Sequence, residues 1–338
     1  MFNNNYRIAD KSVWKGRIDS EDNYDAFRWH QWIQYIDLSK DDLPAFKGTL
    51  GFCIIGFCCD VGVQINKGRF GADKAPRSIR KELSNLPCWF KEEVKIFDAG
   101  DILAEGYTLE QSQNSLAQAV QKILNLNLFP IVLGGGHEVA FGHYNGILNY
   151  LSQNKSKPKI GIINFDAHLD IRPYHNGGSS GTMFRQIADI CSSKELEYSY
   201  MCVGVEKYSN TVDLFKTADK LGVSYILEKD ISISDDWSLI EKFDKFLNNQ
   251  EYIYVTICSD VFSSAFAPGV SAPQPLGLDP ETVLKFLKYI IKTKKVVSFD
   301  IAEVSPRFDQ DNTTANLAKV LIFSVVNTLC QIYNLSID

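Results

Sequence analysis

The sequence has no excess of basic residues, because 35 Lys and Arg stand against 41 Asp and Glu, a net charge of −6 at pH 7. It also lacks any run of eighteen apolar residues that would span a membrane, and its start has neither an apolar signal-peptide core nor a small-residue cleavage site. We therefore expect a cytoplasmic protein with no nucleic-acid or membrane partner, acting on a small molecule.

The chain also lacks Pro/Gly linkers, low-complexity tracts and internal repeats. None of its eight cysteines shows zinc-ribbon spacing, so most are expected to be small core residues in a reducing compartment. A hydrophobic content of 45% over 338 residues can fill one large core. We predict a single domain over residues 1–338, with residues 1–48, which contain Trp14, Trp29 and Trp32, as an N-terminal extension packed on it.

Short β-rich runs alternate with amphipathic segments of helix length, which is typical of an α/β fold with a parallel sheet. Helices are predicted over residues 109–124, 280–291 and 315–329 from their periodicity and capping residues. Eight strands are expected at residues 50–58, 94–97, 129–133, 159–165, 198–205, 223–227, 252–257 and 296–301.

Polar clusters follow four of these strands. They are residues 134–138 (GGGHE), 166–170 (DAHLD), 258–260 (CSD) and 300–303 (DIAE). Strand ends of an open parallel sheet share one edge, where ligands bind, so these clusters are expected to form one site. A tight turn or a helix cap would explain any one of them, but four in the same position indicate a common function.

The cluster after the strand at residues 159–165 predicts a metal site. Extended geometry sends Asp166, His168 and Asp170 to the same side as the chain leaves the sheet. Oxygen-rich ligation with some imidazole suits hard divalent ions such as Mn²⁺ better than structural zinc. The alternative is a loop in which Asp166 caps a turn and His168 fills a polar niche.

These segments resemble the ureohydrolase family of arginases and agmatinases, and the resemblance runs through most of the chain. It implies a three-layer αβα sandwich around an eight-stranded parallel sheet and a centre of one or two Mn²⁺ ions. It also implies that Asp166 and Glu303 serve catalysis, with Glu303 gripping the substrate's amidine. The metal ligands it implies are His137, Asp166, His168, Asp170, Cys258 and Asp260, with Cys258 standing where the family has a bridging Asp.

Three regions, residues 14–31, 56–76 and 170–186, are similar to family members that hydrolyse the amidine C–N bond of N-formimidoyl-L-glutamate, giving L-glutamate and formamide in histidine degradation. The second carboxylate of that substrate needs cationic donors, which makes Arg172 the first candidate and Arg69 the second, with Ser180 as a further donor. Two alternatives stay open, an ion pair for either arginine and a helix-capping role for Ser180.

Cys258 is the main departure from the family pattern, because a thiolate is softer than a carboxylate and binds Mn²⁺ less readily. The second metal would then be weak, absent or a softer ion, unless Cys258 is only a buried protonated thiol. A non-catalytic ureohydrolase-like binding protein and a hydrolase of another guanidino or amidino compound therefore remain alternatives. The sequence also leaves a homo-oligomer open.

Overall fold

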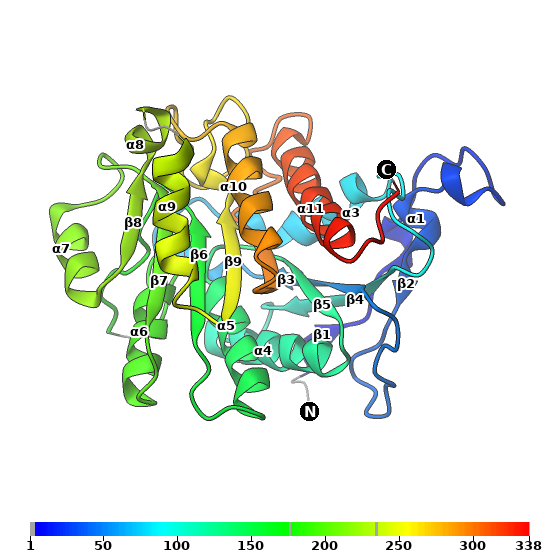
Figure 1. The fold of residues 1–338 in the computed structure, drawn as a ribbon, viewed down its shortest axis with the longest axis horizontal. Helices are drawn as coiled ribbons and strands as arrows, with labels where there is room; N and C mark the ends of the chain where they lie inside the picture. Colours follow the sequence, from blue (N-terminus) through cyan, green and yellow to red (C-terminus); the bar gives the residue numbers. More distant parts are fainter. Residues whose placement is uncertain (1–3, 176, 234–235, 338) are drawn as a thin grey trace.

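The computed structural model describes residues 4–175, 177–233 and 236–337, and its centre is a twisted sheet with helices on both faces (Figure 1). All eight predicted strands form, and they lie parallel in the order β4-β3-β5-β10-β9-β6-β7-β8. Their bounds are β3 (Gly51–Cys58), β4 (Lys95–Leu103), β5 (Phe129–Leu133), β6 (Ile160–Phe165), β7 (Ser199–Val205), β8 (Ser224–Leu227), β9 (Tyr252–Cys258) and β10 (Val296–Ala302). The predicted α/β class is confirmed.

Over the described residues the sheet has ten strands rather than the predicted eight. Two short strands of the N-terminal segment, β1 (Tyr6–Arg7) and β2 (Gln34–Tyr35), both pair with β4, the first antiparallel and the second parallel. A two-residue strand is too short to show a periodic pattern in the sequence. Its position depends instead on pairing with the edge of β4.

Two hydrophobic layers enclose the sheet and make the three-layer sandwich. Alternation along β3 sends Phe52 and Ile54 to one layer and Cys53 and Ile55 to the other. The first layer packs against α3 (Ala75–Leu83), α9 (Asp236–Leu247), α10 (Pro280–Lys292) and α11 (Thr313–Ile332). The second packs against α4 (Leu109–Asn125), α5 (Val139–Ser152), α6 (Met183–Ser193) and α7 (Val212–Leu221). The shorter helices are α1 (Trp29–Trp32), α2 (Val61–Ile65) and α8 (Glu228–Ile233).

The N-terminal segment is joined to this core by three tryptophans, of which Trp14 and Trp29 are buried and Trp32 is half-buried. Trp29 is 1% exposed, the Trp14 indole donates to Asp98 at 2.7 Å, and the Trp32 indole donates to the Val94 carbonyl at 2.9 Å. All eight cysteines are free, and seven of them are buried. That matches the expected use of cysteine as a small core residue.

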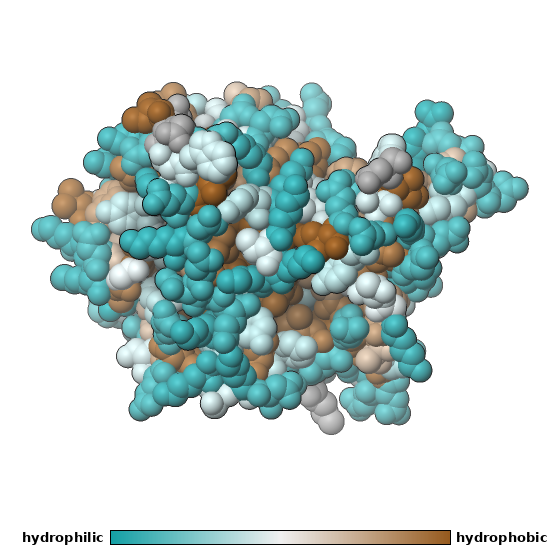
Figure 2. Space-filling view, in the orientation of Figure 1, coloured by the Kyte–Doolittle hydropathy of each residue, from teal (hydrophilic) through white to brown (hydrophobic). Residues whose placement is uncertain are grey.

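One described helix, α11, is long and apolar enough to cross a membrane by length and composition. In the fold, 56% of its most apolar window is buried, and the helix packs against α3 and α10. The face of the molecule in Figure 2 is largely hydrophilic, with hydrophobic side chains interspersed over it.

Candidate metal centre

The predicted site residues converge at the carboxyl edge of the four central strands β5, β10, β9 and β6. These strands are neighbours in the sheet although they are distant in the sequence. A cavity of about 290 Å³ opens at this edge. It is lined by Arg69, His137, His168, Asp170, Arg172, Ser180, Cys258, Asp260 and Glu303. Asp166, the remaining predicted residue, is fully buried and contacts both histidines.

Glycine allows the turn after β5 to reach this edge. A Cβ at Gly135 would lie 1.8 Å from the carbonyl oxygen of Cys59, so no larger residue fits there without moving the backbone. The turn places His137 in the lining of the cavity, where the residue is only 1% exposed. The absence of a side chain at Gly135 therefore lets this turn pass close to the backbone at Cys59.

The first group of candidate ligands surrounds His137. Its Nδ1 lies 2.9 Å from Asp166 Oδ2 and 3.2 Å from Asp170 Oδ2. Ligand atoms of His137, Asp166 and Cys258 all lie within 4.8 Å of one another. This arrangement can hold one cation among imidazole, carboxylate and thiol ligands.

The second group surrounds His168. Its Nδ1 lies 3.2 Å from Asp260 Oδ2 and 3.4 Å from Asp166 Oδ1. Ligand atoms of Asp166, His168 and Asp260 also lie within 4.8 Å of one another. The two oxygens of Asp166 thus face different histidines, which places this carboxylate between two cation positions.

Asp166 also accepts a hydrogen bond from the backbone N–H of His168 at 2.8 Å, as a turn-capping aspartate does. The turn-capping alternative therefore describes part of what Asp166 does. It leaves unexplained why the other oxygen of Asp166 faces His137 and why Asp170 and Asp260 lie beside it.

Carboxyl groups are crowded here around two imidazoles. Burial lowers the pKa of His137 and His168, but the carboxylates beside them outweigh it and raise both pKa values. Burial raises the pKa of Asp170 to about 6, and the negative charge of Asp166 adds to this effect. Burial likewise raises the pKa of Asp260. Burial opposes ionisation of Asp166 too, but hydrogen bonds from His137 and His168 outweigh it and lower the pKa of that carboxyl. A bound cation would stabilise the ionised form of every one of these carboxyl groups.

Buried polar atoms without hydrogen-bond partners provide a test of whether the residues fit a cation. Among the described residues, Asp260 Oδ1 and Glu303 Oε2 are such atoms, and both belong to this cavity. Buried polar groups normally have hydrogen-bond partners. The atoms named here lack one and carry lone pairs, which divalent ions bind. The residues therefore fit a divalent cation such as Mn²⁺.

Cys258 is 2% exposed and lies within the first ligand group. Burial, followed by the charges of Asp166 and Asp260, raises the pKa of its thiol well above the ordinary range. Without a cation the sulfur therefore keeps its proton at neutral pH. The position of Cys258 agrees with a ligand role, whereas its chemistry disfavours a hard ion.

Glu303 reaches the cavity from the end of β10 with a strained backbone. Its φ is +64°, and Asp170 also has a positive φ, of +48°. Non-glycine residues rarely adopt this conformation, and such strain gathers at functional sites. The Glu303 Oε1 atom accepts from the His137 backbone N–H at 3.0 Å, so it helps to fix the turn that carries His137.

The two candidate arginines differ in what they contact. Across the described parts of the chain, the Arg172 guanidinium makes no hydrogen bond or ion pair, so it is available to a ligand in the cavity. Arg69 donates instead to the backbone carbonyls of Val270 and Ser271, at 2.6 and 2.9 Å, and lies over the Phe308 ring. Its guanidinium therefore joins two loops at the rim rather than forming the ion pair considered above.

Ser180 is buried at the cavity wall, and the helix after it, α6, has Thr182 as its N-cap. The helix-capping alternative for Ser180 is therefore wrong. Sequence reasoning did not select Asn66, Lys67 and Ser271, which also line the cavity. Asn66 and Lys67 could have been found from the sequence, because they lie within residues 56–76, one of the regions that resemble the family.

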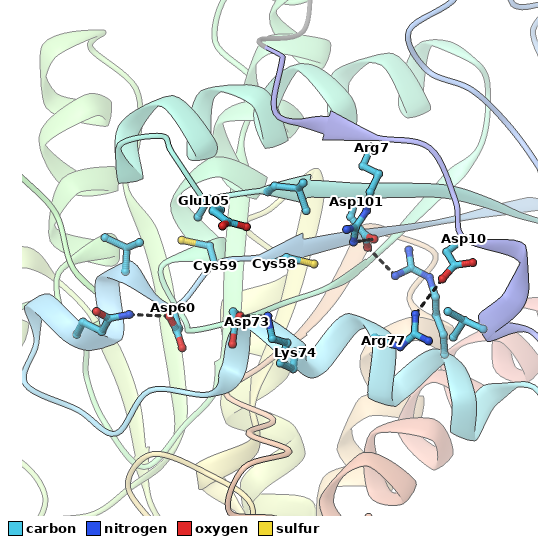
Figure 3. A pocket seen from close by; sticks show the side chains of 16 residues that line it. Arg7, Asp10, Cys58, Cys59, Asp60, Asp73, Lys74, Arg77, Asp101 and Glu105 are labelled. Carbon is cyan, nitrogen blue, oxygen red and sulfur yellow. Dashed lines mark hydrogen bonds and ion pairs between the residues drawn. The ribbon is translucent and has the colours of Figure 1, made fainter.

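A larger cavity, of about 650 Å³, lies beside the ends of β3 and β4 (Figure 3). Several of its charged side chains form ion pairs with one another. Arg7 lies 2.9 Å from Asp101, and Arg77 lies 2.9 Å from Asp10. It has no histidine in its lining and none of the predicted ligands. Size alone would therefore select the wrong cavity.

Comparisons with known proteins show which proteins this chain is similar to. The sequence model described as "Arginase family" matches residues 50–327. A formimidoylglutamase of Clostridium tetani is 63% identical over the full length of both chains, and one of Geobacillus sp. is 44% identical over 93% of each. The crystal structure of formimidoylglutamase from Bacillus subtilis has a TM-score of 0.76 at 22% identity, covering 89% of this chain and 92% of that one. The Trypanosoma cruzi formiminoglutamase with Mn²⁺ has a TM-score of 0.74 at 24% identity, covering 83% and 94%.

Proposed function

Because this chain belongs to the arginase family, we propose that it is a formimidoylglutamase, which hydrolyses N-formimidoyl-L-glutamate to L-glutamate and formamide. Relatives with this name at 63% and 44% identity support the assignment. The observation that carries it is one cavity beside which both groups of carboxylates and imidazoles lie, together with Arg172, whose guanidinium has no partner among the described residues. That combination suits a substrate with a cationic amidine at one end and carboxylates at the other.

We propose Mn²⁺ as the cofactor, at two positions. One would be held by His137, Asp166, Asp170 and Cys258, and the other by Asp166, His168 and Asp260. When bound, such an ion generates a nucleophile from water at neutral pH and acts as a Lewis acid. Asp166 would serve catalysis by joining both positions, and the thiol of Cys258 would make occupancy incomplete.

The remaining residues would bind and orient the substrate. Glu303 has a buried carboxyl group whose Oε2 atom has no hydrogen-bond partner in the part of the chain that the structure describes, which suits contact with the cationic amidinium. Arg172 would bind a substrate carboxylate, with the Ser180 hydroxyl as a second donor on the same wall. Arg69 would stabilise the loops at the edge of the cavity through its hydrogen bonds to the carbonyls of Val270 and Ser271, and so affect substrate binding indirectly.

The proposal is tested by assaying formamide and glutamate release from formimidoylglutamate before and after chelation. We expect chelation to abolish turnover and added Mn²⁺ to restore it, with arginine and agmatine poor substrates. Turnover that survives full chelation would refute the metal-dependent mechanism. Tight binding of formimidoylglutamate without turnover would favour the non-catalytic alternative, and faster turnover of another amidine would favour a different substrate.

A further inference from the structure

A buried chain of hydrogen bonds runs from His137 away from the cavity. His137 Nε2 lies 3.1 Å from Thr256 Oγ1, and the Thr256 hydroxyl donates to Asp300 Oδ1 at 2.5 Å. Thr256 on β9 and Asp300 on β10 are register partners in adjacent parallel strands, and both are fully buried. Neither residue lines the cavity, so neither can touch a ligand there.

The directions of these hydrogen bonds follow from the number of hydrogens available. The Thr256 hydroxyl has a single hydrogen, and the Asp300 carboxylate can only accept, so that hydrogen points to Asp300. The oxygen of Thr256 then offers only a lone pair to His137. His137 Nε2 must therefore carry a hydrogen. When the ring is neutral, as a metal ligand must be, its lone pair lies on Nδ1, the atom that faces Asp166.

Asp300 is held in turn from its other side. Its Oδ2 atom accepts from the Tyr254 hydroxyl and lies 2.5 Å from His143 Nδ1. His143 is fully buried on α5, and its Nε2 contacts the Ser298 hydroxyl. The carboxylate of Asp300 is therefore fixed by groups from β9 and α5 and has no freedom to turn away from Thr256.

We propose that Thr256 and Asp300 are positioning residues that select the Nε2–H form of His137, and that His143 keeps Asp300 in place. The ring is thereby presented to a metal ion through Nδ1 in one orientation. This inference rests on the proposed metal centre at His137. Partners of this kind orient metal ligands, and their removal typically weakens metal binding about 10-fold to 100-fold.

The test replaces Thr256 with Val, which keeps the branched shape and removes the hydroxyl. We expect the affinity for Mn²⁺, measured by competition with a chelating dye, to fall about 10-fold to 100-fold. Thr256→Ser, which restores a hydroxyl, should recover most of the affinity. Thr328→Val is the matched control, since Thr328 is a buried threonine of α11 outside the cavity, and it should leave affinity unchanged.

A second measurement needs no variant. In protein loaded with diamagnetic Zn²⁺, ¹⁵N NMR of His137 should show the metal on Nδ1 and a slowly exchanging hydrogen on Nε2. Metal on Nε2 would overturn the inference even if the Val variant failed to fold.

The outcomes separate this inference from the proposed function. If His137→Ala loses Mn²⁺ while Thr256→Val binds it as the parent does, the metal centre stands and the positioning role is wrong. If His137→Ala retains Mn²⁺ at both positions, the proposed centre itself fails and this inference fails with it.

Discussion

At the scale of single residues, we propose that position 258 limits how many metal ions the centre holds. We expect Cys258→Asp to increase the Mn²⁺ bound per chain and to strengthen its retention during dialysis, because a hard carboxylate would replace a buried protonated thiol. Cys258→Ala should leave at most one ion per chain. Elemental analysis after dialysis measures both.

Cys330 offers a matched control for this prediction, because it is a buried cysteine of α11 distant in sequence from every proposed ligand. Cys330→Ala should leave metal content unchanged. Two stoichiometric Mn²⁺ in the parent, with neither content nor rate changed in Cys258→Ala, would show that the thiol only fills space.

We also propose that Arg172 governs the choice of substrate. Arg172→Ala should raise KM for formimidoylglutamate about 10-fold to 100-fold, the scale of a lost hydrogen bond to a charged group, at roughly 1.5 to 3 kcal/mol. The reason is that its guanidinium, with no partner in the described parts of the chain, would otherwise bind a substrate carboxylate. Steady-state kinetics measure the change.

Arg185→Ala is the control for Arg172, since Arg185 lies on α6, faces Asp189 at 3.5 Å and does not line the cavity. Its KM should match that of the parent. An unchanged KM in Arg172→Ala would remove Arg172 from the binding site.

At the scale of elements, a buried arginine joins α3 to β4. Arg80 donates to Asp98 at 2.8 Å, to Asp101 at 2.7 Å and to the carbonyl of Gly100 at 2.7 Å. Arg80→Met should destabilise the fold by about 3 to 5 kcal/mol, because two buried carboxylates lose their ion pair with Arg80 and, among the described residues, only Asp101 keeps another, with Arg7. Denaturant unfolding at neutral pH measures this loss.

The cost of Arg80→Met should shrink in acid. Burial would raise the pKa of Asp101, but Arg80 and Arg7 outweigh it and lower the pKa. A lowered folded-state pKa gives stability that is complete above the unfolded value of about 3.9 and is lost as pH falls through the folded value. A difference between parent and variant that stays constant from pH 7 down to pH 3 would contradict this account.

At the scale of the whole molecule, we propose that the N-terminal segment is part of a single domain rather than a separate unit. Both of its strands pair with β4, and Trp14 contacts Asp98, the same carboxylate that Arg80 binds. The segment also contributes Arg7 and Asp10 to the wall of the larger cavity (Figure 3). It thus completes one edge of the sheet and lies away from the central strands that carry the candidate metal centre.

The sequence by itself determined the eight parallel strands, three of the long helices (α4, α10 and α11) and the set of residues that meet at the sheet edge. These features depend on neighbours along the chain, on alternation, capping and the polar residues that end each strand. The rule that parallel strands share a carboxyl edge then brings His137, Asp166, Asp260 and Glu303 together without knowledge of strand order.

Only the tertiary structure decided the contacts between residues that are distant in the chain. The strand order places Thr256 against His137, 119 residues away, and assigns the two oxygens of Asp166 to different histidines. It also directs Arg69 to backbone carbonyls some two hundred residues later while leaving Arg172 unpaired in the described parts of the chain. Such contacts depend on the packing of whole elements, which no local pattern of residues encodes.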